Sequence, residues 1–206
     1  MATIILLRHG ENEWVKEHKL AGWIPGVRLN ANGRKQGQDA ADRLGHLPIK
    51  ALYSSPVERC RETAEFLAEK AKLNIIELPE VGEVRYGDWE GKKIAELAKL
   101  PEWHTVQHAP SRHTFPNGES MREVQTRIVD ALESLATQHK NEMIVVCTHA
   151  DLIKMALAHY LGTHLDLFQR IVISPCSASI LKLGEKGDIR VLRMNDHGPI
   201  PLTTNH

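Results

Sequence analysis

The chain has 206 residues, and its 26 lysines and arginines are balanced by 26 aspartates and glutamates, so the formal charge is zero. This balance argues against a nucleic-acid-binding or membrane-surface protein, and the 42% hydrophobic content is that of a globular chain rather than a disordered one. The apolar runs are too short to span a bilayer, and no apolar signal segment follows Met1. We therefore expect a cytoplasmic protein that binds neither nucleic acid nor membrane.

The first 78 residues alternate short apolar runs with amphipathic stretches. Continuous apolar runs such as residues 4–7 are typical of buried parallel strands. Strands are predicted at residues 4–7, 51–55 and 75–78. Helices are predicted at residues 33–46 and 56–72, the second with Pro56 at its first position and Ser55 as its cap.

Residues 79–118 differ from the rest of the chain because prolines and glycines interrupt them repeatedly. The prolines are Pro79, Pro101, Pro110 and Pro116. This composition predicts long loops with one short helix at residues 92–99. Long loops in a compact domain are usually functional. We expect residues 1–206 to form a single domain in which residues 79–118 are a cap inserted over the functional site.

The second half of the sequence returns to alternating elements. Helices are predicted at residues 118–139 and 149–161, the second capped by Thr148 or Asp151. Strands are predicted at residues 143–147, 170–173, 178–183 and 189–194. Residues 185–188 (EKGD) are a hairpin signal, so the last two strands should pair antiparallel, and residues 196–206 should fray. The expected fold is α/β: a doubly wound, mostly parallel sheet with helices on both faces, one antiparallel edge and a cap insertion.

Potential cations follow three of the predicted strands. Arg8 and His9 come directly after the first strand, Arg59 lies one turn into the helix after the second, and His149 follows the strand at 143–147. In doubly wound sheets, ligands bind outside the carboxyl ends of the strands. Because these side chains should meet at that edge, the sequence predicts an anion site there.

Cysteine and histidine do not form metal-binding patterns. The three cysteines are widely spaced and none lies in a C-x-x-C motif, which indicates neither a disulfide framework nor a zinc site. Most of the 12 histidines lack ligand spacing. We expect reduced cysteines in the core, no metal site, and tryptophans that pack in the core or the cap.

Several ordered blocks of the sequence, read together, resemble a known family. The main blocks are residues 7–11 (LRHGE), 54–64 (SSPVERCRETA), 83–91 (EVRYGDWEG) and 148–150 (THA). Two further blocks are residues 29–37 (LNANGRKQG) and 115–120 (FPNGES). The set resembles the histidine phosphatase superfamily, which includes the cofactor-dependent phosphoglycerate mutases. The short block that ends at Gly91 is more similar to the phosphatase branch.

The resemblance implies a role for each residue of the predicted anion site. His9 is the implied nucleophile, which becomes a phosphohistidine while a backbone carbonyl holds its second ring nitrogen. Arg8 and Arg59 suit forked contact with phosphoryl oxygens, and a cationic His149 would stabilise their charge. Glu83 is the implied proton donor, with a pKa raised beside the phosphoryl group.

Several neighbouring residues need separate treatment. The residues expected to bind substrate are Arg8, Asn12, Gly22, Arg59, His149 and Ala150. Many relatives have threonine or serine where this chain has Asn12, but an asparagine amide can also donate to phosphate. Glu80, Asp88 and Glu90 are rivals of Glu83 for the role of proton donor. Arg61, two residues from Arg59, should point elsewhere and make a surface salt bridge.

The sequence therefore favours a metal-independent phosphomonoesterase that acts on a small phosphorylated metabolite without a cofactor. The alternative is a phosphoglycerate mutase-type enzyme, which would need a bisphosphoglycerate primer. A non-catalytic phosphate-binding scaffold is the least favoured hypothesis, because His9, Glu83 and His149 are all present. The identity of the phosphomonoester and the choice between monomer and homodimer remain open.

Overall fold

A six-stranded sheet forms the centre of the computed structural model, which describes residues 1–184 and 187–200. The strands lie in the order β3-β2-β4-β1-β5-β6. Their bounds are β1 Ala2–Arg8, β2 Ile49–Ser54, β3 Ile75–Glu77, β4 Met143–Thr148, β5 Ala178–Leu183 and β6 Ile189–Asp196. The first four pair in parallel, whereas β5 and β6 are antiparallel to their neighbours. The predicted mostly parallel sheet with one antiparallel edge is confirmed.

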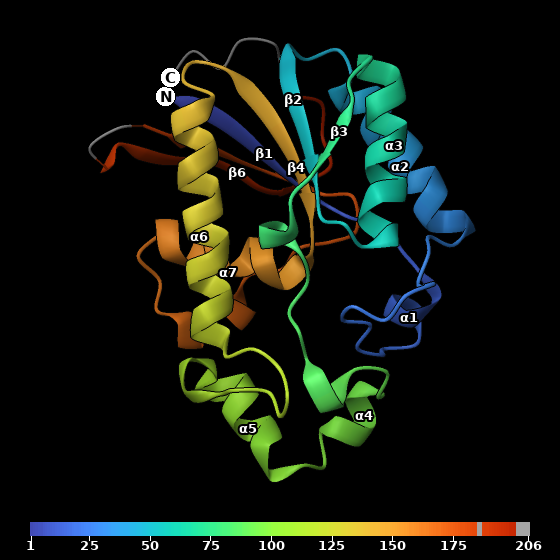
Figure 1. Ribbon diagram of the computed structural model, residues 1–206, viewed down its shortest axis with the longest axis vertical. Helices are drawn as coiled ribbons and strands as arrows, with labels where there is room; N and C mark the ends of the chain where they lie inside the picture. Colours follow the sequence, from blue (N-terminus) through green and yellow to red (C-terminus); the bar gives the residue numbers. More distant parts are fainter. Residues whose placement is uncertain (185–186, 201–206) are drawn as a thin grey trace.

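Helices cover both faces of this sheet (Figure 1). The helices α2 (Ala31–Leu44) and α3 (Glu58–Ala71) pack on one face, and α6 (Met121–Gln138) and α7 (Ala150–Tyr160) pack on the other. The central strands are apolar on both sides because each face carries its own core. In β1, Ile4 and Leu6 join the core under α6 and α7, and Ile5 and Leu7 join the opposite one.

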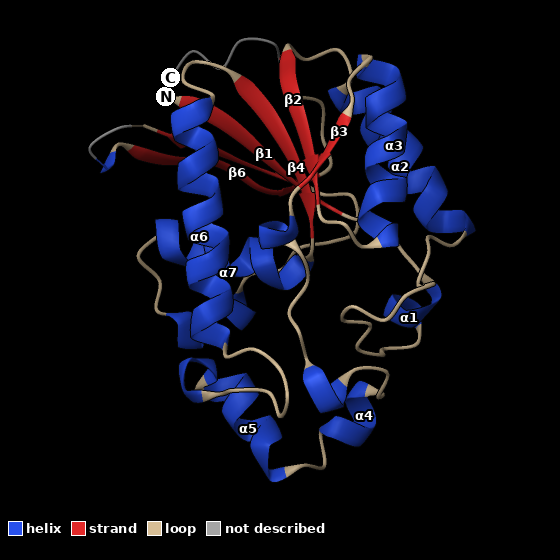
Figure 2. Cartoon of the chain, in the orientation of Figure 1, coloured by secondary structure: helices blue, strands red, loops and turns tan. Residues whose placement is uncertain are grey.

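The segment between β3 and α6 consists of short helices joined by loops (Figure 2). Its elements are η1 Pro79–Val81, η2 Gly87–Trp89, α4 Ile94–Leu97, α5 Pro101–His108 and η3 Pro110–Arg112. α4 falls inside the predicted helix at residues 92–99, whereas α5 was not predicted. α4 and α5 lie at the bottom of Figure 1, together with α1 (Glu13–Lys16) beyond the sheet. The prediction that residues 79–118 act as a cap stays a prediction.

The predicted strand at residues 170–173 is wrong. The helix η4 (Leu165–Arg170) ends there, and Ile171 N–H donates to Phe168 O at 3.0 Å to close its last turn. Ile171 has an extended backbone, but neither it nor the residues up to Ile173 pair with a strand among the described residues. Ile173 O instead accepts a 2.6 Å hydrogen bond from Arg8 Nη1. The apolar run therefore lies against the functional site rather than in the sheet.

Helix boundaries also depart from prediction: α2 lies two residues upstream of residues 33–46, and α6 begins at Met121 rather than at residue 118. α3 begins at Glu58 rather than Pro56, and the Ser55 hydroxyl, 3.3 Å from Val57 N, lies too far upstream to cap the helix. The N-cap of α7 is His149 itself, neither Thr148 nor Asp151. Residues 185–186 of the hairpin signal and residues 201–206 of the tail lie outside the described residues.

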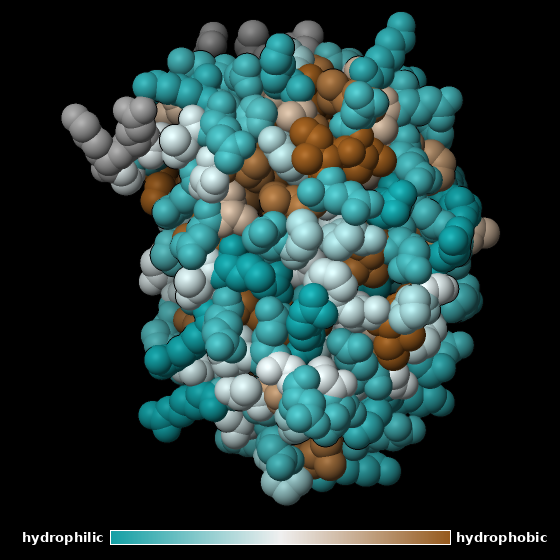
Figure 3. Space-filling model, viewed as in Figure 1, coloured by the Kyte–Doolittle hydropathy of each residue, from teal (hydrophilic) through white to brown (hydrophobic). Residues whose placement is uncertain are grey.

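The surface and the cysteines agree with the expectations from composition. The face in Figure 3 is mostly hydrophilic, with apolar side chains in scattered patches. In the described part of the chain, no helix combines the length and apolarity that a membrane crossing requires. The three cysteines are buried and free, as predicted.

Candidate active site

The carboxyl ends of β1, β2 and β4 bring the predicted cations together. Arg8 ends β1, His9 follows it, and His149 follows β4, which is the parallel neighbour of β1. Arg59 projects from the first turn of α3, the helix after β2. Arg8, His9 and Arg59 line a single cavity of about 510 Å³ together with Asn12 and Glu83. His149 contacts this lining, with its Nδ1 3.2 Å from Glu83 Oε2 and 3.2 Å from Arg59 Nη2. We call the group Arg8, His9, Asn12, Arg59, Glu83 and His149 the polar floor of this cavity.

His9 is held as a neutral imidazole. Its Nδ1 lies 2.7 Å from Gly10 O, which can only accept, so this nitrogen carries the proton. Its Nε2 accepts a 3.3 Å hydrogen bond from Arg59 Nε. Burial, reinforced by the positive charges of Arg59, His149 and Arg8, lowers the pKa of His9 well below the usual value. The ring thus keeps Nε2 unprotonated on a residue that lines the cavity, and its other nitrogen contacts a backbone carbonyl, as expected.

Gly10, the residue after His9, permits a close contact between the loop after β1 and the first turn of α2. A Cβ on Gly10 would lie 2.6 Å from Gly33 O, in the first turn of α2. Gly10 N–H donates to Thr63 Oγ1 at 3.0 Å, and that hydroxyl donates to Arg59 O at 2.7 Å. The loop after β1 is thereby tied to the helix that carries Arg59.

The two arginines of α3 have different environments, as predicted. Arg59 is buried, with Nη2 donating to Gly22 O at 3.0 Å and lying 3.4 Å from Glu83 Oε2. Arg61 lies on the surface, 3.1 Å from a carboxylate oxygen of Glu77, with about half of each side chain exposed. Only Arg59 therefore reaches the cavity.

Glu83 is the carboxylate that enters the floor. Its Oε2 lies 3.2 Å from His149 Nδ1, and its Oε1 accepts from Val84 N at 3.0 Å. Burial acts to raise the pKa of Glu83, but the charges of His149 and Arg59 outweigh it and lower the pKa to about 2. The shift is opposite to the one expected beside a phosphoryl group, because here Glu83 is itself the anion that the two cations hold.

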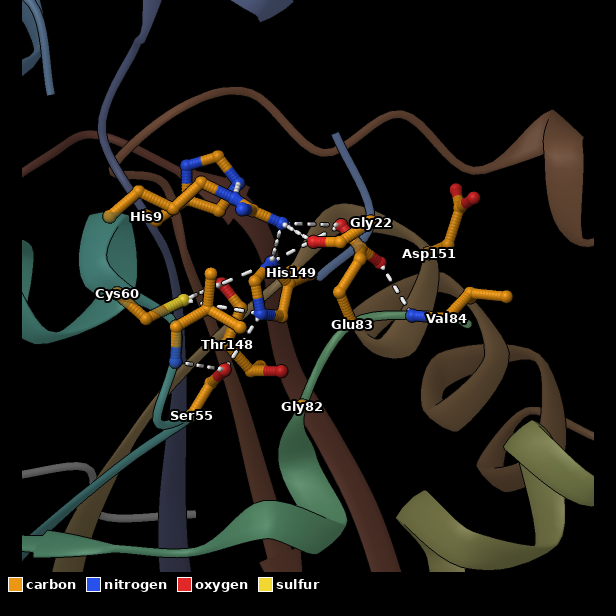
Figure 4. A network of polar contacts seen from close by, with 12 residues as sticks. His9, Gly22, Ser55, Cys60, Gly82, Glu83, Val84, Thr148, His149 and Asp151 are labelled. Atoms are coloured by element: carbon orange, nitrogen blue, oxygen red, sulfur yellow. Dashed lines mark hydrogen bonds and ion pairs between the residues drawn. The ribbon is translucent and has the colours of Figure 1, made fainter. Parts of the chain in front are cut away.

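His149 lies between Glu83 and two groups that the sequence analysis did not assign to the site (Figure 4). Its Nε2 is 2.9 Å from Ser55 Oγ and 3.4 Å from Cys60 Sγ. Burial acts to lower the pKa of His149, but Cys60 and Glu83 outweigh it, so the net shift is upward. Ser55 had been interpreted as a helix cap and Cys60 as a core residue. Their positions after β2, a neighbour of β4, were the available signal.

Three buried donors in the floor have no hydrogen-bond partner among the described residues. They are Arg8 Nε, Asn12 Nδ2 and Arg59 Nη1. Asn12 Oδ1 already accepts from Val15 N at 2.8 Å to cap α1, so the amide nitrogen is the atom left for a ligand. A buried donor without an acceptor costs roughly 1–3 kcal/mol. A phosphoryl group, with several acceptor oxygens and negative charge, would satisfy all three.

The remaining predicted substrate contacts differ in position. Ala150, at the start of α7, lines the cavity beside His149. Gly22 is not part of the cavity wall, and its carbonyl accepts from Arg59 Nη2. Its φ of +51° favours glycine, and a Cβ there would lie 2.3 Å from Glu90 Oε1. Gly22 therefore contacts the arginine rather than the cavity.

A second group of residues that line the cavity is apolar. We call Trp89, Trp103, Val106, Phe115 and Met121 its apolar roof, because all five line the same cavity and four of them precede α6. Trp89 contacts Phe115 edge to face at a centroid distance of 5.3 Å and stacks on Trp103 at 6.1 Å. The cavity lining thus includes both a strongly polar group and an aromatic group.

Donor atoms of His9, Glu83 and His149 lie within 4.8 Å of one another, a grouping that could hold a metal ion. The guanidinium of Arg59 is adjacent to this group, 3.3 Å from His9 Nε2 and 3.4 Å from Glu83 Oε2. A divalent cation would have to approach this fixed positive charge within a buried site, which electrostatics opposes. The arrangement suits an anion better than a metal.

Comparison with known proteins gives a family for this arrangement. The family model of the histidine phosphatase superfamily (branch 1) matches residues 4–197. Phosphoserine phosphatase 1 of Hydrogenobacter thermophilus is 29% identical over 197 residues, covering 95% of this chain and 92% of that protein. Phosphoglycerate mutase-like protein 4 of Arabidopsis thaliana is 35% identical over 158 residues, covering 74% of this chain and 68% of that protein.

A solved structure agrees with the sequence relatives. Bacillus stearothermophilus YhfR superposes with a TM-score of 0.89 at 28% identity, covering 95% of this chain and 98% of that one. The family match extends from β1 to beyond β6 and so includes every residue of the polar floor. The chain belongs to the histidine phosphatase superfamily, branch 1.

Proposed function

We propose that the protein is a phosphomonoesterase that hydrolyses a small phosphorylated metabolite through a phosphohistidine on His9. The observation that carries this proposal is the state of His9: a buried, neutral imidazole that lines the cavity, with Nδ1 bonded to Gly10 O and an unprotonated Nε2 beside the Arg59 guanidinium. Around it lie the unpartnered N–H donors of Arg8, Asn12 and Arg59. A nucleophile surrounded by phosphate-binding groups is what phosphoryl transfer requires.

In the first step, the lone pair of His9 Nε2 attacks phosphorus and the bond from phosphorus to the ester oxygen breaks. Arg8, Arg59 and a protonated His149 hold the three equatorial oxygens, and the departing alkoxide takes a proton from Glu83. A bound phosphoryl dianion competes for Arg59 and His149, the two cations that now lower the pKa of Glu83. Its negative charge also raises that pKa directly, which favours the acid form.

In the second step, water attacks phosphorus and the bond from phosphorus to Nε2 breaks. Glu83, now a carboxylate, takes one proton from this water, and inorganic phosphate leaves. His9 returns to its neutral form with Nδ1 still bonded to Gly10 O. All proton transfers use side chains of the polar floor, so the proposed reaction requires neither metal nor cofactor.

The comparisons support this reaction class. The relative from Hydrogenobacter thermophilus is named a phosphoserine phosphatase. The Arabidopsis relative is named a phosphoglycerate mutase-like protein, which keeps a mutase as the alternative. A mutase would return the phosphoryl group from His9 to a second hydroxyl instead of to water, and it would need a bisphosphoglycerate primer.

Rapid-quench trapping tests the proposal. The wild-type protein is mixed with a labelled phosphomonoester, quenched, and analysed for a protein-bound phosphate that is stable in base and labile in acid. We expect the adduct in the wild type and none in His9→Ala, with turnover insensitive to a chelator. Turnover that survives in His9→Ala, or that a chelator abolishes, contradicts the mechanism. Monophosphoglycerate supplied with its bisphosphate primer separates a mutase from a hydrolase.

A further inference from the structure

The cavity is too large for phosphate alone. At about 510 Å³ it lies within the range of roughly 300–1,000 Å³ that is typical of small-molecule sites, whereas one water occupies roughly 30 Å³. The polar floor engages only the phosphoryl end of a ligand. The remaining volume is therefore available to the leaving group, and the walls of that volume should determine which leaving group fits.

The position of the leaving group follows from the proposed proton donor, Glu83, which lines the cavity. In an in-line displacement the leaving oxygen lies opposite His9 Nε2, and the proposed proton donor, Glu83, must be near it. The chain continues from Glu83 to two roof-side aromatic residues, Tyr86 and Trp89, which both line the cavity. Tyr86 and Trp89 each contact Phe115 edge to face, at centroid distances of 5.1 Å and 5.3 Å.

The cavity offers few charges to a polar leaving group. Beyond the polar floor, its charged lining residues are Asp151, Lys154 and Lys19, and its other polar lining residues include His18, Gln107 and Gln169. Lys154 Nζ lies 3.1 Å from Asp151 Oδ1, and the Tyr86 hydroxyl donates to Asp151 Oδ2 at 3.1 Å. Lys19 is paired with Glu17. An ammonium or carboxylate on the leaving group would have to displace these pairs.

We propose that the preferred substrates are phosphomonoesters of apolar, aromatic-bearing alcohols, and that Trp103 is a specificity-determining residue. This inference rests on the proposed phosphatase function and names the substrate class of the same site. Trp103 suits the role because it is partly exposed, lines the cavity, and stacks on the buried Trp89 with planes inclined by 27°. An aromatic leaving group would extend this stack and remove both surfaces from water.

The test compares alkyl esters, because their leaving oxygens have similar basicity and differ mainly in the attached group. The substrates are 3-phenylpropyl phosphate, glycerol 3-phosphate and phosphoserine. We expect kcat/KM for 3-phenylpropyl phosphate to exceed the other two by at least tenfold. Equal or higher kcat/KM for phosphoserine overturns the inference while leaving the phosphatase proposal intact.

Two variants test whether Trp103 causes the preference for 3-phenylpropyl phosphate. Trp103→Ala should reduce kcat/KM for 3-phenylpropyl phosphate at least fivefold and change that for glycerol 3-phosphate less than twofold. Phe66→Ala is the matched control, because it truncates an aromatic residue that packs against Gly37 on the far side of the sheet. It should leave the ratio of kcat/KM for 3-phenylpropyl phosphate to kcat/KM for glycerol 3-phosphate unchanged. A parallel loss on both substrates in Trp103→Ala contradicts the assigned role.

A binding measurement covers the case in which Trp103→Ala does not fold. Inhibition constants of 3-phenylpropylphosphonate and 3-hydroxypropylphosphonate are measured on the wild-type protein. We expect the phenyl compound to bind at least tenfold more tightly, and equal affinities would overturn the inference. If no ester is hydrolysed at all, the proposed function fails, whereas the phosphonates still report on the roof through direct calorimetric binding.

Discussion

The polar floor and the apolar roof of the cavity are built in different ways. The polar floor comes mostly from residues at the ends of parallel strands or one turn beyond them, and it keeps buried donors without protein partners. The apolar roof comes mostly from the segment between β3 and α6, and its side chains pack against one another. The unsatisfied donors of the floor are available to bind a ligand, but they lower the stability of the folded protein. The packed side chains of the roof raise that stability.

This contrast separates the expected effects of substitution. The orphaned donors of the floor should matter for ligand binding far more than for folding, because they make no hydrogen bond in the folded protein. Buried roof residues should matter for folding as well as for substrate choice, because they belong to the core that includes Val84, Leu97 and Ile128. The following predictions test that separation, beginning with the largest expected effect.

Arg59→Ala should lower kcat/KM by about 10³-fold or more, because one lost donor to developing charge typically costs about 10²–10³ and Arg59 supplies more than one. Arg59→Lys should recover little, because lysine lacks the forked geometry that reaches His9, Gly22 and Glu83. Steady-state kinetics on both variants measures this, with the thermal midpoint as a check of folding. Full recovery in Arg59→Lys would show that charge alone is sufficient.

Phe115→Ala should destabilise the protein by about 3–5 kcal/mol, the range for truncating a buried phenylalanine. Phe115 is 3% exposed and contacts Tyr86, Trp89 and His113. Urea unfolding of the variant and the wild type gives this difference. A loss below about 1 kcal/mol would mean that the roof contributes little to the core and would break the contrast with the floor.

Glu83→Gln should reduce kcat by about 10²-fold for alkyl esters, because an alkoxide leaves slowly without a proton. For 4-nitrophenyl phosphate the loss should be much smaller, since nitrophenolate is a stable leaving group. Single-turnover rates with both substrates test the assignment. Equal losses on the two esters would indicate that Glu83 acts by positioning Arg59 or His149 rather than as a proton donor.

Stability at acid pH should report the ion pairs of Glu83. Because its pKa falls from 4.5 to about 2 on folding, the ionised carboxylate stabilises the protein above pH 4.5, and this contribution is lost as the pH falls toward 2. The loss is at most about 3 kcal/mol. We expect Glu83→Gln to lose less unfolding free energy than the wild type between pH 6 and pH 3. Identical losses would contradict the pKa shift.

Arg61→Ala should have the smallest effect. Its ion pair with Glu77 is half exposed, so the loss should be below about 1 kcal/mol, and kcat/KM should stay within twofold of the wild type. The same assays applied to Arg59→Ala provide the comparison. A large loss of kcat/KM in Arg61→Ala would contradict the conclusion that, of the two arginines of α3, only Arg59 acts at the cavity.

Local sequence patterns were sufficient for most of the sheet and for the position of the site at its edge. The apolar run of β4, the cationic residue after β1 and the arginine in the first turn of α3 are local signals, and parallel strands bring their carboxyl ends to one edge. The residue roles came from the family resemblance. The strand expected at residues 170–173 was wrong because apolar residues that line a cavity and those that pair in a sheet have the same local pattern.

Only the tertiary structure decided how the site is completed. The contact of His149 with Ser55 and Cys60, the orphaned donor of Asn12 and the pKa of Glu83 all depend on groups distant in sequence. The same is true of the roof, whose irregular segment has no periodicity from which its packing could be inferred. The sequence by itself determined the fold class and the meeting of the cations at one sheet edge, since these follow from short-range patterning. Folding decided charge states and the shape of the cavity, because electrostatics and packing act between neighbours in space.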